Sequence, residues 1–193
     1  MSTTRIVIAE DEPLIRLDLR ESLVEQGYDV VGEAGDGAEA LSLVREHKPE
    51  VTILDIKMPN VDGLTAAREI VAERLSAVVI LTAFSQRELV EQARDAGALN
   101  YLVKPFQGQE LVPAIELAIA RFRELVALSD QAELLSDQLE TRKVVDRAKG
   151  KLMDDSGMTE QDAFRFLQQT AMTSRSSMRE VAASVIDGEL GPS

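Results

Sequence analysis

Apolar residues recur in five short runs over the first 120 positions, and amphipathic segments with a helical period separate these runs. The runs are RIVIA (5–9), DVVGEA (29–34), VTILD (51–55), AVVILT (77–82) and LNYLV (99–103). Strands rich in Val, Ile and Leu that alternate with helices are typical of a parallel sheet covered on both faces. The pattern therefore predicts an α/β fold with a doubly wound five-stranded parallel sheet.

After residue 107 the pattern changes, and the chain is predicted to be helical to about residue 153. Leucine and alanine recur there in steps of 3 and 4, as in a coiled-coil seam: Leu125, Leu128, Ala132, Leu135 and Leu139. Two more helices should begin at Thr159 and Ser177, since an acid follows each of them three residues later, as in a capping box. Residues 125–186 are thus predicted to form a small all-α three-helix domain with a coiled-coil lead-in. The seam is too short to be stable alone, so it should pack against this domain or against a second copy of the chain.

The composition narrows the possible chemistry. The chain has 193 residues, of which 45% are hydrophobic, and it contains no cysteine. Disulfides, thiolate metal sites and cysteine nucleophiles are therefore excluded. No basic N-terminal region precedes an apolar run, and no stretch approaches about 18 consecutive apolar residues. We expect a soluble, cytoplasmic protein that does not contact membranes.

Charge is distributed unevenly along the chain, whose formal net charge is −13. Residues 1–120 contain 11 basic and 21 acidic residues, whereas residues 141–193 contain 8 of each. The segment RKVVDRAKGK (142–151) carries a local net charge of +4, with Asp146 as its single acid and five basic residues: Arg142, Lys143, Arg147, Lys149 and Lys151. The acidic part argues against a general affinity for polyanions, so contact with nucleic acid is expected only at the C-terminal part. Without further information, the basic segment could equally be a solvated helix face.

Charged and hydroxyl side chains follow four of the five predicted strands. In a doubly wound sheet, ligands bind outside the carboxyl ends of the strands, so these residues should meet there. They are Glu10, Asp11 and Glu12 after the first strand, Asp55 at the end of the third, Thr82 at the end of the fourth, and Lys104 and Pro105 after the fifth. Taken singly, Asp55 could be a turn former, Thr82 a helix cap and Lys104 a surface charge.

Together these side chains favour a phosphoryl site. Two carboxylates about 4 Å apart repel each other by about 4 kcal/mol at an effective dielectric constant near 20, so a cluster needs a compensating cation. Oxygen ligands with room for water suit Mg²⁺. A carboxylate beside such an ion can attack phosphorus, and the Lys104 ammonium and the Thr82 hydroxyl could then meet the charge on the phosphoryl oxygens.

Residues 5–119 resemble the receiver domains of bacterial two-component response regulators, which have a flavodoxin-like fold. The motifs that carry the resemblance are AEDE, LDIKMPNVDG, LTAF and YLVKPF. The resemblance implies that Asp55 accepts a phosphoryl group from a histidine kinase. It also implies that Glu10, Asp11, Asp55 and the Lys57 carbonyl hold Mg²⁺, that Thr82 and Tyr101 form a switch pair, and that the Lys104–Pro105 bond is cis. Lys57 and Phe84 occupy positions that tune the rate of dephosphorylation in the family. Because members of the family are regulators, the resemblance also implies that this protein is not an enzyme.

The tail resembles the ANTAR domain, a three-helix RNA-binding module of antiterminators. The matching stretches are AKGKLM, GMTEQDAF, Ala171 with Met172, and a closing VA pair. The resemblance implies that phosphorylation controls a domain that binds RNA hairpins in nascent transcripts, with contacts from Arg142, Lys143, Arg147, Lys149, Gly150 and Lys151. Lys151 stands where an aliphatic residue is usual and should add charge to the basic face, while Phe164 is expected in the core.

These expectations combine into a model with three segments. Residues 5–119 form the receiver domain, residues 120–140 a helical linker with the seam, and residues 125–186 the ANTAR domain. Phosphorylation would alter the receiver surface and free or pair the seam, giving a phosphorylation-dependent homodimer that prevents formation of a terminator. The alternative is a DNA-binding transcriptional regulator with a helical output domain. Against it, SSMREVAASVI offers only Arg179 as a base-reading side chain in its last helix.

Overall fold

The computed structural model describes residues 3–83 and 87–191, and for residues 87–90 it describes the backbone alone. The N-terminal part contains a parallel sheet in the order β2-β1-β3-β4-β5. Its strands are β1 (Arg5–Ala9), β2 (Asp29–Ala34), β3 (Val51–Asp55), β4 (Ala77–Thr82) and β5 (Asn100–Val103). The predicted doubly wound fold is confirmed, and β5 alone departs from its predicted bounds, starting one residue later.

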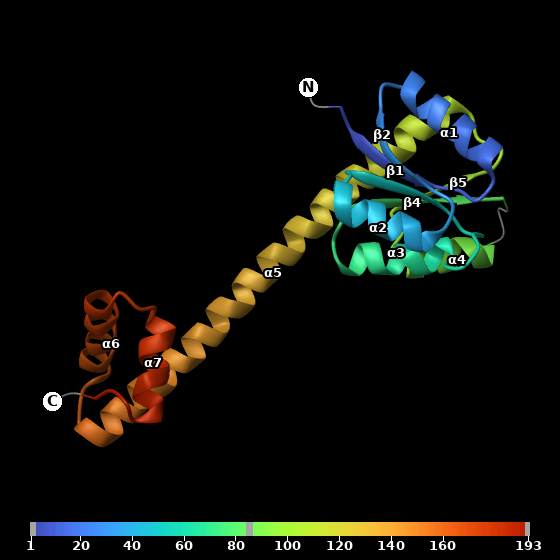
Figure 1. The fold of residues 1–193 in the computed structure, drawn as a ribbon. Coiled ribbons are helices and arrows are strands. Elements are labelled where there is room, and N and C mark those ends of the chain that lie inside the picture. Colours follow the sequence, from blue (N-terminus) through green and yellow to red (C-terminus); the bar gives the residue numbers. More distant parts are fainter. Residues whose placement is uncertain (1–2, 84–86, 192–193) are drawn as a thin grey trace. The chain divides into compact units, whose positions relative to one another are not determined.

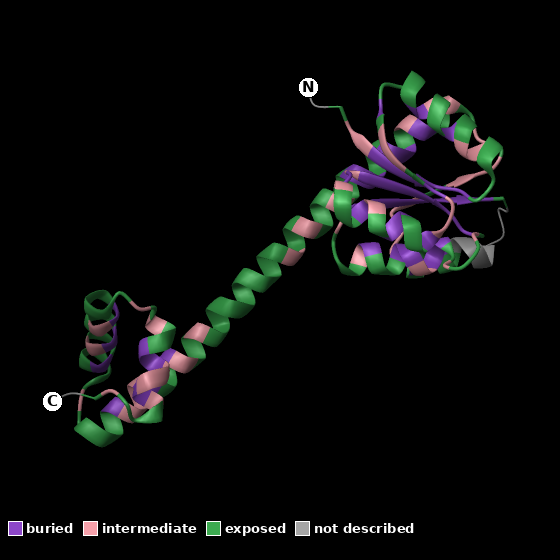
Figure 2. Cartoon of the chain, in the orientation of Figure 1, coloured by how far each residue is buried: buried purple, intermediate pink, exposed green. Residues whose placement is uncertain are grey.

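Helices cover both faces of this sheet (Figure 1). The helices are α1 (Pro13–Glu25), α2 (Gly37–His47), α3 (Gly63–Ala72), α4 (Arg87–Asp95) and the first part of α5 (Gly108–Ser156). One core joins the sheet to α2, α3 and α4, and a second joins the opposite face to α1 and α5. Residues of β3 and β4 are buried throughout, as the purple strands in Figure 2 show, because both faces are covered.

Three helices begin or end at residues whose side chains or backbone preferences favour these positions. Pro13 occupies the first turn of α1, where its missing N–H costs nothing, and Gly27 follows that helix with φ of +86°. The side chains of Asp36 and Asp62 accept hydrogen bonds from the free N–H groups at the starts of α2 and α3. These caps fix the loops at the carboxyl edge of the sheet.

The chain divides into two compact units between Ala127 and Leu128. Helix α5 is continuous across this boundary, with 49 residues from Gly108 to Ser156. It confirms the helix predicted for residues 107–153, beginning one residue later and ending three residues later. The predicted 120–140 linker therefore has no break in its backbone: it is the middle of this helix.

The second unit contains the end of α5 together with α6 (Glu160–Ser174) and α7 (Met178–Asp187). The capping residues predicted for these helices are confirmed, because the Thr159 and Ser177 side chains accept from the backbone N–H groups three residues later. The unit has its own apolar core, to which each helix contributes three buried side chains: Val145, Ala148 and Leu152 from α5, Ala163, Leu167 and Ala171 from α6, and Val181, Ala182 and Val185 from α7. Burial on one side of each helix thus holds three short segments together.

Phe164 differs from its expectation. Its side chain is 45% exposed, and Phe166 packs against the core instead. Residues at positions 163, 167 and 171 face inward, and position 164 lies about 100° further round the helix than position 163. The prediction that Phe164 belongs to the core was wrong.

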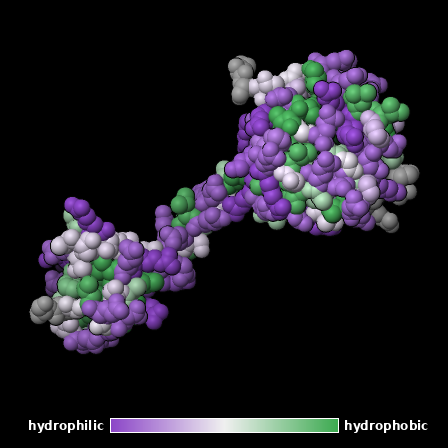
Figure 3. All heavy atoms as spheres, viewed as in Figure 1, coloured by the Kyte–Doolittle hydropathy of each residue, from purple (hydrophilic) through white to green (hydrophobic). Residues whose placement is uncertain are grey.

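The leucine seam on α5 is exposed. Leu125, Leu128, Leu135 and Leu139 are each more than half exposed, so no element of its own unit covers any of them. In Figure 3 hydrophobic residues stand among hydrophilic ones along this stretch of α5. The alternative in which the seam packs against its own domain is therefore not realised. None of the helices in the described ranges combines the length and the apolar character needed to cross a membrane.

Candidate functional site

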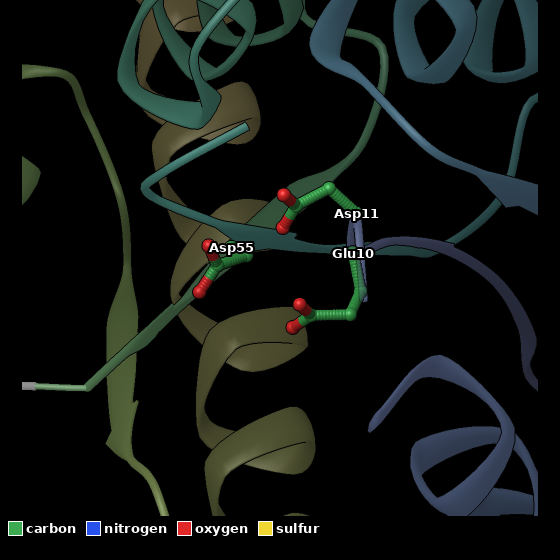
Figure 4. A group of neighbouring side chains, drawn as sticks. All are labelled: Glu10, Asp11 and Asp55. Carbon is green, nitrogen blue, oxygen red and sulfur yellow. The ribbon is translucent and has the colours of Figure 1, made fainter. Parts of the chain in front are cut away.

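Three carboxylates meet at the carboxyl edge of the sheet. Glu10 and Asp11 follow β1, Asp55 ends β3, and these two strands are neighbours with Ala9 opposite Leu54. One oxygen of each carboxylate lies within 4.8 Å of the other two, and Figure 4 shows the three side chains grouped together and extending to the same side. Parallel pairing thus brings together acids that lie 45 positions apart in the sequence. Glu10 and Asp55 are buried, whereas Asp11 is exposed.

Lys104 compensates the charge of the two buried carboxylates. Its Nζ lies 2.6 Å from Asp55 Oδ1 and 2.5 Å from Glu10 Oε2, and the lysine side chain is 14% exposed. Burial lowers the pKa of Lys104, but the hydrogen bonds and opposite charges of Asp55 and Glu10 outweigh burial and raise that pKa overall. Burial raises the pKa of Glu10, an effect that Lys104 partly offsets. The ammonium therefore stays charged between two carboxylates that water reaches poorly.

Backbone groups fix the orientation of the same carboxylates. The Lys57 N–H donates to Asp55 Oδ2 at 2.9 Å, and the Glu12 N–H donates to Glu10 Oε1 at 3.3 Å. Asp55 thus makes the local turn bond that its position suggests, and it also faces Lys104 with its other oxygen. Arg16 Nη1 donates to the Glu10 carbonyl at 2.6 Å and holds the loop after β1 from the side of α1.

A tight turn after β3 positions Asp55, and it requires glycine at residue 63. A Cβ added to Gly63 would lie 1.9 Å from the carbonyl oxygen of Asp55, far inside van der Waals contact. The Gly63 N–H donates to the Ile56 carbonyl at 3.0 Å, and Asn60 has φ of +59°. Sequence reasoning did not assign Gly63 or Asn60 a role, although the stretch PNVDG carries the signal of a turn.

The other predicted residues of this edge are also placed. Thr82 is buried at the end of β4, next to Asp55 in the lining of a cleft of about 670 Å³ that also includes Asp11 and Lys104. Apolar side chains, among them Leu14 and Phe106, line the rest of this cleft. Tyr101 lies on β5 with its side chain 42% exposed. The Lys104–Pro105 bond is cis, as predicted. Phe84 lies outside the described residues.

Within the second unit, the six residues predicted to contact RNA fall into two groups. Arg142 and Lys143 have side chains 82% and 68% exposed, with Asp146 3.9 Å from Arg142 and Glu140 2.7 Å from Lys143. Arg147 is exposed, and a Cβ on Gly150 would meet no atom within 4 Å. This first group is directed to solvent.

The second group, Lys149 and Lys151, contacts the protein itself. Lys149 Nζ lies 2.8 Å from Asp146 and 2.9 Å from Glu160, which joins α5 to the first turn of α6. The bond with Asp146 is the main reason why the pKa of Lys149 is raised. Lys151 Nζ donates to the Ile186 carbonyl at 2.7 Å, near the C-terminal end of α7, where such carbonyls lack helical partners. Lys151 is therefore held against the end of α7 instead of being directed to solvent like the first group.

Comparison with known proteins places both units in families. The model of the response regulator receiver domain matches residues 6–116, and the model of the ANTAR domain matches residues 133–186. The chain belongs to the response regulators with a receiver domain and an ANTAR domain. Response regulators are typically not enzymes.

A relative with the same arrangement is the transcriptional regulatory protein PdtaR of Mycobacterium tuberculosis. It is 57% identical over 183 residues, covering 95% of this chain and 89% of its own length. The chemotaxis protein CheY of Bacillus subtilis is 38% identical over 58% of this chain and 93% of its own length. Among solved structures, the receiver domain of the response regulator NarL from Mycobacterium tuberculosis is 34% identical, with a TM-score of 0.60 over 62% of this chain and 98% of that one.

The acidic pocket of the receiver domain suits a divalent cation. All its candidate ligands are hard oxygen atoms, one of the carboxylates is open to solvent, and the cluster has the dimensions of a metal site. Mg²⁺ favours such ligands and keeps several waters, for which the exposed side of Asp11 leaves room. The residues present therefore fit the ion that receiver domains bind.

Proposed function

We propose that a histidine kinase phosphorylates Asp55 of this response regulator and that phosphorylation controls binding of RNA hairpins by the ANTAR domain. The protein would act as a transcription antiterminator by holding hairpins that otherwise allow a terminator to form. The observation that carries the proposal is the Lys104 ammonium within 2.6 Å of Asp55 in an acidic pocket, on the same chain as an ANTAR domain. We propose residues 5–119 as the receiver domain, 120–140 as the linker and 125–186 as the ANTAR domain.

The phosphoryl transfer follows from the placement of Asp55. A carboxylate oxygen of Asp55 forms a bond to phosphorus while the phosphorus–nitrogen bond of the phosphohistidine breaks, and the leaving imidazole nitrogen keeps the electron pair. The Lys104 ammonium and the Thr82 hydroxyl are placed to contact the phosphoryl oxygens. Glu10, Asp11, Asp55 and the Lys57 carbonyl would hold Mg²⁺, which supplies positive charge beside those oxygens.

Phosphorylation would be read out through Thr82 and Tyr101. Thr82 lies beside Asp55, and its hydroxyl would turn toward the phosphoryl group. The ring of Tyr101, now 42% exposed on neighbouring β5, would follow inward. A complete change from 1:99 to 99:1 requires about 5.5 kcal/mol of differential stabilisation. New hydrogen bonds to one phosphoryl group and burial of the seam in a dimer are together of that order.

RNA binding would then depend on a dimer. The exposed leucines at positions 125–139 form the seam that a second copy would cover. Arg142, Lys143 and Arg147 are the cations that remain available for phosphate contacts, and Gly150 would allow close approach. Lys149 and Lys151 would contribute by holding α6 and α7 in place. The acidic receiver domain repels nucleic acid and would restrict binding to this part of the chain.

The test is a measurement of mass and RNA affinity before and after treatment with acetyl phosphate and Mg²⁺. The probe is a hairpin selected with this protein from a pool with a constant stem and random loops. We expect the mass to double and RNA binding to tighten in the native chain, whereas Asp55→Asn should show neither change. RNA affinity that responds equally in Asp55→Asn would refute control through Asp55. Preferential binding of duplex DNA over hairpins would instead favour a DNA-binding regulator, although Arg179 is already paired with Asp137 at 2.7 Å.

A further inference from the structure

Helix α6 leaves an aromatic residue and a methionine in solvent. Phe164 is 45% exposed and Met172 is 75% exposed, while Ala163, Leu167 and Ala171 carry the buried face of the same helix. Phe164, Gln168 and Met172 follow one another at spacings of 4, so they lie along one side of the helix, and the exposed Arg175 follows directly after the last turn. We name these four residues the α6 stripe. Both apolar side chains are therefore available to contact a ligand on this side of the helix.

The charge of this surface favours an anionic ligand. Residues 163–175 contain no acid, although the chain as a whole has a net charge of −13. Arg165 is 60% exposed and lies 3.7 Å from Asp162 at the start of α6. Arg175 is exposed, and within the described residues it has no ion pair. A polyanion could therefore approach the last three turns of α6 without meeting a carboxylate of that helix.

The stripe has the chemical character of a surface that contacts bases. Unpaired bases stack on aromatic rings and on guanidinium planes, and the amide of Gln168 can both donate to and accept from a base edge. By contrast, a helix that pairs in a coiled coil needs apolar side chains at two positions of every heptad, as the seam on α5 has. Two apolar residues separated by glutamine and followed by arginine do not provide that.

The end of the stripe that begins with Phe164 lies one turn from a contact between α6 and the basic segment of α5. Lys149, in the middle of that segment, is joined to Glu160 in the first turn of α6 at 2.9 Å. A hairpin whose backbone contacts Arg142, Lys143 and Arg147 would therefore have α6 within reach of its loop. Phosphate contacts position a nucleic acid, and contacts with bases give specificity.

We propose that the α6 stripe reads unpaired bases in the loop of the RNA hairpin, with at least one base stacked on Phe164. This inference rests on the proposed RNA-binding function and adds the residues that would give it specificity. Phe164 contacts a base face, Met172 extends the apolar surface, and Gln168 and Arg175 contact base edges and the adjacent backbone.

The experiment uses the full chain, treated with acetyl phosphate and Mg²⁺, and two hairpins with the same stem. One hairpin carries the selected loop, and the other carries that loop with its bases replaced by abasic sites. We expect Phe164→Ala to weaken binding of the selected loop by about 5- to 150-fold, the range for losing one base–aromatic stack. Binding of the abasic hairpin should not change, and Phe164→Trp should retain the affinity.

Two matched variants separate this effect from others. Gln169→Ala changes an exposed residue of α6 outside the stripe and should bind both hairpins as the native chain does. Arg147→Ala should weaken both hairpins alike and reduce the salt dependence of binding, as the loss of a phosphate contact does. Circular dichroism should show the native helix content in every variant, because the substituted side chains are exposed.

The possible failures can be told apart. If the native chain binds neither hairpin, the proposed RNA-binding function itself fails. If it prefers the selected loop and both Phe164→Ala and Met172→Ala retain that preference, RNA binding stands and the inference is overturned. A loss of dimer mass in Phe164→Ala, with unchanged RNA affinity per dimer, would identify the stripe as a protein interface and would also overturn it.

Discussion

Lys104 holds together a cluster that would otherwise repel itself. Its ammonium lies within 2.6 Å of both Glu10 and Asp55, whose side chains are 1% and 9% exposed. Removing one partner from a buried charge pair leaves the other partner desolvated without compensation, which costs more than the pair contributes. The same lysine therefore stabilises the receiver domain, and under the proposed function it would also contact the phosphoryl group.

We predict that Lys104→Met, measured with a metal chelator present, lowers the free energy of unfolding of the receiver domain by about 3 kcal/mol at pH 8. The deficit should shrink at lower pH. Burial already raises the pKa of Glu10, and losing Lys104 removes a group that lowers it. A carboxyl group with a raised folded-state pKa destabilises the fold above that pKa, and the cost disappears as the group is protonated.

Urea denaturation at pH 5 and pH 8 measures the effect. Lys48→Met, which changes an exposed lysine at the end of α2, is the control and should stay within about 0.5 kcal/mol of the native chain at both pH values. An equal deficit for Lys104→Met at both pH values would show that the carboxylates do not carry the penalty.

Helix α5 belongs to both units of the chain. Its two ends each bury an apolar face, whereas its middle is exposed. Its first turns pack into the sheet core through Leu111, Ile115 and Ala118, and its last turns pack into the ANTAR core through Val145, Ala148 and Leu152. Residues 130–140 between these parts are exposed on every side. Most of the stability of a helix comes from the packing of an apolar face, so this middle stretch is the part that depends most on a partner.

We predict that Leu135→Lys prevents dimer formation after treatment with acetyl phosphate and Mg²⁺, while the unfolding of the monomer is unchanged. Leu135 is 54% exposed and belongs to the seam, whereas its neighbour Leu134 is 65% exposed and lies outside the seam. Leu134→Lys removes a neighbouring leucine that is also more than half exposed, and it is the matched control. Sedimentation equilibrium gives the masses, and the idea fails if both variants dimerise equally well.

The two units of the chain have separate hydrophobic cores. The receiver core contains the sheet and the helices on its two faces, and the ANTAR core contains side chains from α5, α6 and α7 alone. A ligand that binds one folded unit stabilises that unit by an amount set by its concentration relative to its Kd. The units should therefore unfold in separable transitions that respond to different ligands.

We predict that Mg²⁺ raises the unfolding temperature of the receiver transition and leaves the ANTAR transition in place. At 100 times its Kd the ion should contribute about 2.7 kcal/mol to the receiver domain. Differential scanning calorimetry with and without Mg²⁺ is the measurement. Asp11→Asn, which changes an exposed carboxylate of the cluster, should remove most of the shift. A shift of both transitions together would show that the units unfold as one.

Much of this protein follows from the order of its residues. The apolar runs and the Pro, Gly and Asp residues beside them determine the strands and the first helix turns, because backbone preferences and caps act over a few positions. The parallel sheet then places every strand end on one edge, which is why Glu10, Asp55, Thr82 and Lys104 could be predicted to meet. Exposure of the seam was left open by the sequence, which allowed a partner within the chain or outside it.

Tertiary packing decided which side chains of α5 and α6 are buried, exposed or paired within the second unit. On α6, the sequence marks Ala163, Leu167 and Ala171 as a first, apolar row, and Phe164 begins a second row with the same spacing one residue further on, so spacing alone does not exclude Phe164 from the core. Contact with α5 and α7 buries the first row and leaves Phe164 in solvent. Lys149 and Lys151 likewise look like solvated cations in the sequence, and only the proximity of Glu160 and the end of α7 makes them structural. Long-range contacts select one of several faces that local patterns permit, because burial depends on which surfaces meet.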